Sequence, residues 1–560
     1  MATETDNAQP APEATPEEIN ASCRGPVLFL FASAAVWLVQ AALAGVLGSF
    51  KIHVPDFLAN CPIFTYGHLQ ANAWAAFLFG FGGNAGLGLT LWMLSRLRGM
   101  PLARPGFVVA GTVLWNVGVT AAMVGISMGD QSGVAGLELP KYASRVLLIG
   151  QAFIAFSAIL TYFSRRHEKL YPATWHLIAA LVALPWVLGT AHWLLVETPV
   201  GGAAQIPVGH WAVTSLVQVW LGCMGLAALL YFIPKLTGRE LYSRQWAALG
   251  FWLLLLLGGW VSLNSASPLP VWQIALSRFA SGLFIFVVIA VGWNLRQTAK
   301  GVPLTGSEDL TLKCMGFALG AWVVTGLFTF ANVCPDWNKI IQFTYANTAL
   351  RNVFAWGFFA LAMIGAILYV APRLLGSSVD WVCEKTNKWI YRSIALGAVV
   401  MLLTGVGMSW GHGKSLNAIA AAAAPKGQVT KYSVEITEDG KAKTVERNLG
   451  EIQSLHARGE LAASATVKRS VASTEEGAKP TEDQITVAEL PGYAAWPAVI
   501  QRSALRPMRM AFLGEILFLV GSLVFLGSLG CLLFRNCCGE CSPMSLWRQY
   551  RESKAEGGTQ

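Results

Sequence analysis

Three ionisable residues interrupt the apolar runs of this chain. Arg278 lies in QIALSRFASG, Arg351 in TALRNVF and Glu515 in FLGEILF. Charged side chains inside apolar segments are costly and often functional. The interpretation we favour is internal pairing or snorkelling to the membrane surface. The functional alternative is that they serve a proton path or hold an anionic lipid or a quinone.

Histidines are the candidates for metal or haem ligation. His176 and His192 flank one apolar run, and His210 lies at the start of the next. We favour interfacial or hydrogen-bonded core positions for His176 and His192 over ligation of a haem. For His210 we favour a satisfied core imidazole, because a copper site needs about three ligands. His412 follows an apolar run and His456 lies in a polar segment, and we expect both at the surface.

The cysteines do not form the pattern of a disulfide-rich extracellular protein. Cys223 and Cys314 lie within or beside apolar runs and are expected to pack as small apolar side chains. The one cluster is Cys537, Cys538 and Cys541 in RNCCGEC. A C-x-x-C without a second pair or histidines is a weak metal signal, so we do not expect a metal there.

The chain that must position these residues is strongly apolar. Of its 560 residues, 54% are hydrophobic and 13% are charged, and the mean hydropathy is +0.50. Soluble domains carry about 25% charged residues. Continuous apolar runs favour helices, and about 20 residues cross a bilayer. We predict an all-α polytopic membrane protein with about twelve spans. They lie near 26–49, 72–96, 106–128, 145–163, 173–197, 210–234, 245–264, 272–294, 310–332, 348–371, 389–409 and 509–534.

Basic residues are segregated between alternate connections, so the net charge of +9 does not indicate nucleic-acid binding. The opposite short connections carry only Lys51, Lys141 and Lys339. The positive-inside rule then predicts that both termini are cytoplasmic. Residues 1–22 lack the basic start and apolar core of a signal peptide, and we expect a disordered tail over 1–23. The basic connections and tail contain Arg96, Arg98, Arg104, Arg165, Arg166, Lys169, Lys235, Arg239, Arg244, Arg296, Lys300, Arg373, Lys385, Lys388, Arg535, Arg548, Arg551 and Lys554.

A polar segment divides the expected membrane domain. Eleven spans are expected over 24–412, the polar segment over 413–494, the last span over 495–534 and a cytoplasmic tail over 535–560. EITEDGKAKTV alternates polar and apolar residues around Asp439-Gly440, which predicts a β-hairpin, and GEIQSLHARGELAASA is helix-like. The charge rule places the segment on the periplasmic side of a Gram-negative membrane. We favour a surface elaboration; the alternative is a docking surface for a partner subunit or cytochrome.

Several motifs resemble one membrane-protein family. Residues 64–84 read FTYGHLQANAWAAFLFGFGGN, which resembles the second membrane helix of the catalytic subunit of cbb3-type (C-family) haem-copper oxidases. VPDFLANCPIFTYG, YFIPKLTGRELYS, YVAPRLLG and IQRSALRPMRMAFLGEILFLVGS resemble further parts of it, at consistent spacing. The resemblance implies a subunit I-like bundle of twelve helices. It also implies haem b, a high-spin haem and copper held by histidines, beside a cross-linked tyrosine.

The haem-ligand positions implied by the resemblance carry no histidine. The ligand of the second helix falls on Ala73, and the two ligands of the tenth helix fall on Leu350 and Asn352. His68 cannot take over, because five helical residues separate it from Ala73 by roughly 140° and about 7.5 Å. We therefore expect no haem in this chain.

The copper positions implied by the resemblance are mostly lost as well. His210 in IPVGHWAV keeps the first position. The adjacent pair falls on Ser262 and Leu263 in WVSLNSASPLPVW, and the tyrosine falls near Leu256. We therefore expect no copper either.

Bulky apolar residues stand at or beside the former ligand positions, namely Trp74, Trp211, Leu350, Phe354 and Trp356. A vacated haem pocket would cost roughly 24 cal/mol per Å³ of cavity. We hypothesise that these side chains refill the space. Open, haem-sized pockets between the second, sixth and tenth helices would contradict this hypothesis.

Three functions remain open from the sequence. The favoured one is a cytochrome c oxidase subunit I-like protein of a respiratory electron-transfer complex in a bacterial inner membrane. The catalytic centre of such a protein would be degenerate. The protein would contact membrane lipid and hold partner subunits such as a membrane-anchored cytochrome c. The second is a working cbb3-type terminal oxidase, from cytochrome c to O2, with atypical haem ligation. The third is a transporter or quinone-binding protein with Arg278, Arg351 and Glu515 along a path.

Overall fold

The structure, a computed structural model, falls into two compact units. The described residues of Met1–Val333, Leu350–Met401 and Phe512–Gln560 form what we call the bundle unit. Those of Cys334–Ala349 and Leu402–Ala511 form the sheet unit. Cys538 and Cys541 lie outside the described residues. The structure describes residues 14–164, 170–263, 268–341, 344–376, 384–422, 431–438, 441–471, 481–493 and 496–537.

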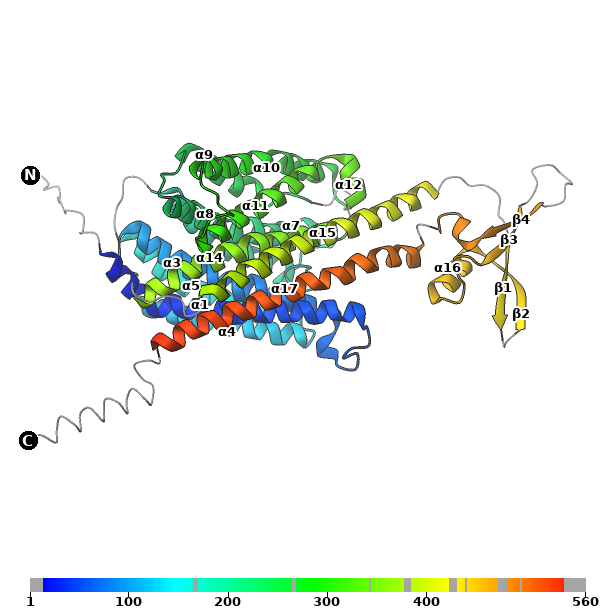
Figure 1. Cartoon of the computed structure of the whole chain (residues 1–560), viewed down its shortest axis with the longest axis horizontal. Helices are drawn as coiled ribbons and strands as arrows, with labels where there is room; N and C mark the ends of the chain where they lie inside the picture. Colours follow the sequence, from blue (N-terminus) through cyan, green and yellow to red (C-terminus); the bar gives the residue numbers. More distant parts are fainter. Residues whose placement is uncertain are drawn as a thin grey trace, which may run out of the picture. The chain divides into compact units, whose positions relative to one another are not determined.

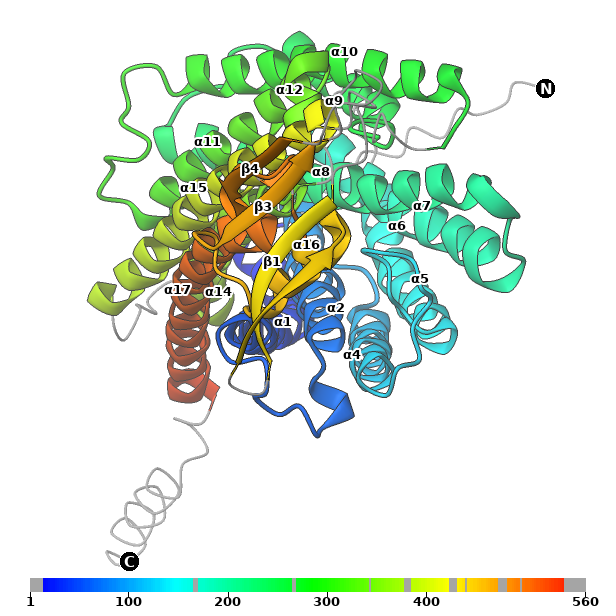
Figure 2. The same cartoon turned by 90° about the vertical axis from the view of Figure 1, so that its right-hand side faces the viewer.

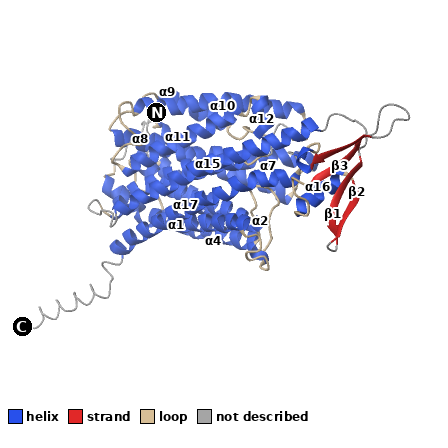
Figure 3. Cartoon of the chain, turned by 45° about the vertical axis from the view of Figure 1, so that its right-hand side comes forward, coloured by secondary structure: helices blue, strands red, loops and turns tan. Residues whose placement is uncertain are grey.

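Helices account for most of the described residues (Figures 1 and 3). The α-helices are α1 (Pro16–His53), α2 (Tyr66–Ala75), α3 (Asn84–Arg98), α4 (Pro105–Ser127), α5 (Lys141–Phe163), α6 (Pro172–His192), α7 (Gln205–Thr214), α8 (Gly222–Thr237), α9 (Arg244–Leu257), α10 (Val271–Thr298), α11 (Leu310–Ala331), α12 (Pro335–Ile341), α13 (Ala346–Asn352), α14 (Leu361–Leu375), α15 (Glu384–Ala422), α16 (Leu449–Arg458) and α17 (Pro497–Cys537). Wider π-helical turns are η2 (Ala76–Gly83), η3 (Trp193–Glu197), η5 (Ser215–Leu221) and η6 (Val353–Ala360). Short 3₁₀ turns are η1 (Pro62–Phe64), η4 (Gly202–Ala204) and η7 (Val487–Glu489).

Eleven helices within the described ranges are long and apolar enough to cross a membrane. The π-helical turns join neighbouring α-helices into single spans, such as Tyr66–Arg98 and Ala346–Leu375. This confirms the prediction of an all-α polytopic membrane protein.

The seventh expected span, near 245–264, is represented by the shorter helix α9. Gly258 and Gly259 end the helix, and Ser262 then adopts a left-handed φ of 63°. A side chain at Gly259 would clash with the Ser215 hydroxyl, so the chain turns where only glycine fits.

Helix α1 begins before the expected boundary at residue 24. Thr15 accepts a hydrogen bond from the Glu18 amide at 3.3 Å, and Glu18 accepts one from the Thr15 amide at 2.8 Å. This capping box, with Pro16 as the first helical residue, stabilises the start. Residues 16–23 are therefore helical rather than disordered, and residues 1–13 lie outside the described part.

Three spans of the bundle unit are almost wholly enclosed by the others. The most apolar windows of Tyr66–Arg98, Gly202–Thr237 and Ala346–Leu375 are 100%, 83% and 94% buried, against 39% for Pro105–Ser127. In the end-on view, α4 and α5 lie side by side at one edge and α10 and α11 at another (Figure 2). The enclosed spans are the second, sixth and tenth, where most of the expected ligand positions lie.

The sheet unit contains the strands of the described residues, in the order β2-β1-β3-β4. They are β1 (Lys431–Glu438), β2 (Lys441–Arg447), β3 (Thr466–Val471) and β4 (Thr481–Thr486). The predicted hairpin is confirmed, because β1 and β2 are antiparallel with Glu438 opposite Lys441. The helix-like segment forms α16, which stops at Gly459 with a φ of 80°. Helix α15 continues to Ala422, beyond the expected boundary at 412.

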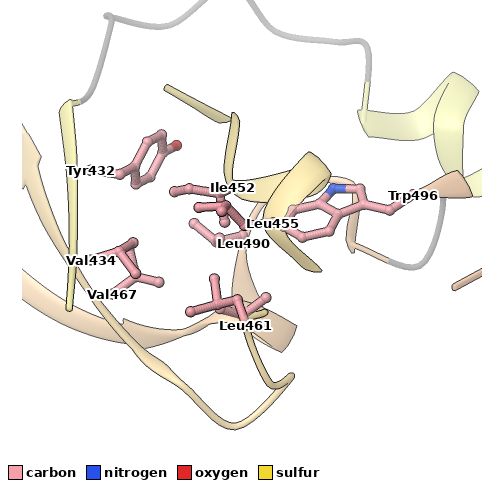
Figure 4. Packing of buried hydrophobic residues seen from close by; sticks show 9 residues of the cluster. Tyr432, Val434, Ile452, Leu455, Leu461, Val467, Leu490 and Trp496 are labelled. Atoms are coloured by element: carbon pink, nitrogen blue, oxygen red, sulfur yellow. The ribbon is translucent and has the colours of Figure 1, made fainter. Parts of the chain in front are cut away.

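Helix α16 covers one face of this sheet and forms its core. Val434 and Val467 face each other across β1 and β3, and Ile452 and Leu455 pack onto them from the helix (Figure 4). His456 is fully buried, and its Nδ1 donates to the Leu461 carbonyl at 2.8 Å. The surface position expected for His456 is therefore wrong, because its imidazole donates a hydrogen bond to a backbone carbonyl inside the core. His412, which was also expected at the surface, is partly buried.

Replacing Ile452 with alanine will destabilise the sheet unit by about 2–5 kcal/mol. The Ile452 side chain is fully buried, so truncation leaves a cavity under the sheet. Amide hydrogen exchange of β1 and β3 measures the effect. The exposed Ser454, on the same helix, provides the control Ser454→Ala. Equal exchange in both variants would contradict the packing described.

Candidate functional site

Arg351 and Trp74 join the tenth and second spans directly. Cζ of Arg351 lies 4.6 Å from the centroid of the Trp74 ring, a cation–π contact. Trp74 follows Ala73 in sequence, and Arg351 stands between Leu350 and Asn352. The contact therefore links the two helix segments at which haem ligands were expected.

Two carboxylates accompany this buried cation. Glu138, in the connection before α5, and Glu515, on α17, both interact electrostatically with Arg351. Glu138 Oε1 accepts a hydrogen bond from the Gly136 amide at 2.8 Å, and the Gly136 carbonyl accepts one from Trp74 Nε1 at 3.0 Å. Four side chains, linked in part through the Gly136 backbone, thus form one polar cluster. We call it the Arg351 cluster (Arg351, Trp74, Glu138 and Glu515).

Helix α1 leaves room for the Glu515 carboxylate. A Cβ added at Gly45 would lie 2.7 Å from Glu515 Oε2. Arg351 Nε and Glu138 Oε2 are buried and have no hydrogen-bond partner among the described residues. The cluster is therefore held by charge and ring contact more than by a full set of hydrogen bonds.

Arg278 does not belong to this cluster. It is exposed on α10, whereas Arg351 and Glu515 are partly buried. In the described structure, Arg278 therefore does not share this cluster with Arg351 and Glu515. Arg278 faces the outside of the bundle unit because its neighbours Ser277 and Ala280 occupy the inner face of α10.

Aromatic rings fill the space beside the Arg351 cluster. The Phe77 ring lies 6.2 Å from Trp74 and 5.1 Å from Trp356, centroid to centroid. Trp356 stacks on Phe518 of α17 at 4.3 Å, with an interplanar angle of 7°. All four rings are buried. The second, tenth and twelfth spans are thus packed together through side chains.

His210 and Leu263 border a cavity of about 450 Å³. Its walls are largely apolar and include Trp186, Trp211 and Trp272. His210 Nε2 donates to the Val261 carbonyl at 2.8 Å. The hydrogen bond to Val261 brings His210 close to Ser262 and Leu263, so the three expected copper positions lie near one another. The Nε2 atom of His210, however, is engaged by the Val261 carbonyl.

The remaining membrane histidines have hydrogen-bonded positions. His192 bonds Ser144 Oγ at 2.8 Å and Glu197 Oε1 at 2.9 Å through its two ring nitrogens. Glu197 also pairs with Arg145. His176 Nδ1 donates to the Pro172 carbonyl at 3.0 Å. Over the described ranges, no group of at least three His, Cys, Asp or Glu side chains is arranged to hold a metal.

The residues present do not fit a haem or a copper ion at the expected positions. Ala73 and Leu350 offer no ligand atom, Asn352 offers an amide in place of an imidazole, and His210 stands without histidine neighbours. The sequence pointed to Arg351 and Glu515 but not to Glu138, because an acidic residue in a connection carries no local sign that its charge acts on an arginine of a distant span.

Comparison with known proteins agrees with this architecture. The sequence model of the family described as Cytochrome C and Quinol oxidase polypeptide I matches residues 25–422. A Cytochrome c oxidase subunit 1 homolog of Azorhizobium caulinodans is 24% identical over 405 residues, covering 67% of this chain and 71% of that protein. The Cytochrome c oxidase subunit 1 of Rhodobacter capsulatus is 23% identical, covering 70% and 77%.

More distant matches point the same way. The Cbb3-type cytochrome c oxidase subunit CcoN1 of Stutzerimonas stutzeri is 22% identical, covering 61% of this chain and 74% of that protein. A cryo-EM structure of a heme-copper terminal oxidase dimer superposes with a TM-score of 0.59 at 13% identity, covering 91% of this chain and 84% of that one. The bundle unit therefore has the subunit I fold.

Proposed function

Because this chain belongs to the Cytochrome C and Quinol oxidase polypeptide I family, we propose that it is a subunit I-like protein of a respiratory electron-transfer complex whose haem-copper centre is degenerate. Its role is structural: the bundle holds partner subunits in the membrane. A membrane-anchored cytochrome c is the partner class that the family relationship suggests. Both termini are proposed to be cytoplasmic, from the distribution of basic connections.

One observation carries this proposal. The Arg351 guanidinium lies on the Trp74 ring, between the two helix segments where haem ligands would stand. A guanidinium and an indole in contact at that point offer no imidazole to a haem iron. The Phe77 ring contacts Trp356 at a tilt, and Trp356 stacks on Phe518, so the packing extends toward α17.

The same arrangement explains how the fold is kept without its metal centre. A haem buried between helices contributes a large contact surface, and its loss exposes cavity walls at a cost of roughly 24 cal/mol per Å³. Aromatic side chains supply large contact areas in its place. The subunit retains its shape for partners while its redox chemistry is lost.

The haem and copper content of the purified chain tests the proposal. Expressed in a haem-sufficient bacterial host, the protein is expected to contain far less than one haem and one copper per chain, by pyridine haemochrome spectrum and metal analysis. The similar protein of Rhodobacter capsulatus, expressed in the same host, serves as the positive control. Stoichiometric haem b with copper would instead favour a working oxidase with atypical ligation.

A further inference from the structure

Several spans of the bundle unit end at one face, beside a second cavity. Helices α3, α8 and α14 end there with basic last turns that contain Arg96, Lys235 and Arg373. The cavity has a volume of about 590 Å³, and its wall includes Tyr171, Lys235, Arg239 and Arg244. It therefore lies where the membrane-crossing segments give way to their connections.

The charges around this cavity are unbalanced. Glu240 is the one carboxylate among the residues that form its wall, against three cations. Among the described residues, Lys235, Arg239 and Arg244 make no ion pair, because the pairs found there involve Arg145, His192, Arg458 and Arg469. Uncompensated cations at close range repel one another unless an anion is bound.

Two further arginines add to the positive charge. Arg96 and Lys235 both approach the Trp92 ring, at 6.0 and 5.9 Å from its centroid. Arg373 and Lys235 share the Tyr369 ring, at 3.4 and 5.6 Å. Lys235 Nζ also donates to the Tyr231 hydroxyl at 2.8 Å. Aromatic rings thus hold the cations in place but do not neutralise them.

The negative end of a helix dipole stabilises some of these cations, but not all of them. A cation at a helix C-terminus is favourable, and Arg373 donates to the Tyr369 carbonyl at 2.6 Å. Arg244, however, is the first residue of α9, where the helix end is itself positive. Burial raises the pKa of Tyr171 to about 12, against the opposing charge of Arg244, so the phenol remains a neutral group beside it. Arg244 is thus an exposed cation at the helix end that favours an anion.

We propose that this cavity, with Arg239, Arg244 and Lys235 in its wall, binds a phosphate group of an anionic phospholipid. Arginine forks match phosphate oxygens in pairs. The wall also includes Leu97, Pro234 and Leu241, which offer apolar contact to the glycerol end of acyl chains. A free phosphate has the same anionic chemistry, but it would leave these apolar groups uncovered. Basic pockets between membrane helices recognise lipid headgroups in this way.

Lipid titration of the delipidated full chain, followed by native mass spectrometry, tests the site. We expect phosphatidylglycerol to bind more tightly than phosphatidylcholine by about tenfold or more, and the double variant Arg239→Gln/Arg244→Gln to lose that preference. Arg296→Gln is the matched control, since Arg296 is exposed in the last turn of α10 and does not contribute to the cavity wall. Unchanged binding in the control, with loss in the double variant, supports the proposal.

A competition arm separates the two sources of phosphate. Millimolar inorganic phosphate that displaces phosphatidylglycerol completely would assign the cavity to a soluble phosphate compound and overturn the lipid assignment. Equal binding of the two lipids, or full retention in the double variant, would overturn the phosphate site itself. If the double variant does not fold, the single variant Arg239→Gln, on an exposed connection, is measured in its place with the same expected direction.

Discussion

Replacing Arg351 with methionine will lower the free energy of unfolding by about 3–5 kcal/mol. The substitution removes the positive charge that acts on Glu138 and Glu515, which are both partly buried. It also removes the contact with Trp74 at 4.6 Å. Reversible unfolding in mixed micelles, followed by far-UV circular dichroism, measures the change.

Three companion variants separate charge from shape. Arg351→Lys keeps the cation and is expected to lose less stability than Arg351→Met. Adding Glu515→Gln to Arg351→Met removes one unpaired carboxylate and is expected to recover part of the loss. Arg278→Met, at an exposed arginine on α10, is expected to change stability by about 0.5 kcal/mol or less. Equal losses at Arg278 and Arg351 would show that the Arg351 cluster has no special role.

Replacing Trp356 with alanine will cost about 3–5 kcal/mol of stability. Its side chain is 6% exposed, stacks on Phe518 at 4.3 Å and contacts Phe77 at 5.1 Å. Truncation opens an apolar cavity between the tenth, second and twelfth spans. The same unfolding measurement records the loss.

Ligand rescue distinguishes a cavity from a general disturbance. An apolar cavity stays dry and accepts benzene or xenon, so benzene is expected to restore part of the stability of Trp356→Ala and to leave the parent unchanged. Trp293→Ala is the control, because Trp293 is 52% exposed on α10. If benzene stabilises the control equally, the hypothesis that side chains refill the haem space loses its support.

Local signals were enough to predict the membrane fold. The length of each apolar run depends only on neighbouring residues, and eleven of the expected spans are helices of sufficient length. The β1–β2 hairpin was likewise predictable, because alternation and Asp439-Gly440 are adjacent in sequence. The shortness of α9 was not, since the turn after it depends on the Ser215 side chain of another span.

The sequence by itself determined the class of the protein, the order of eleven of its spans and the absence of histidine at the expected haem positions. Only the tertiary structure decided which charges influence one another: Arg351 interacts electrostatically with Glu138 and Glu515, while Arg278 faces outward. The physical reason is that the enclosed spans are apolar on every side, so periodicity does not reveal which face of each helix meets which neighbour. That rotation is fixed by packing between residues distant in the chain, such as Trp356 on Phe518 and Arg351 on Trp74.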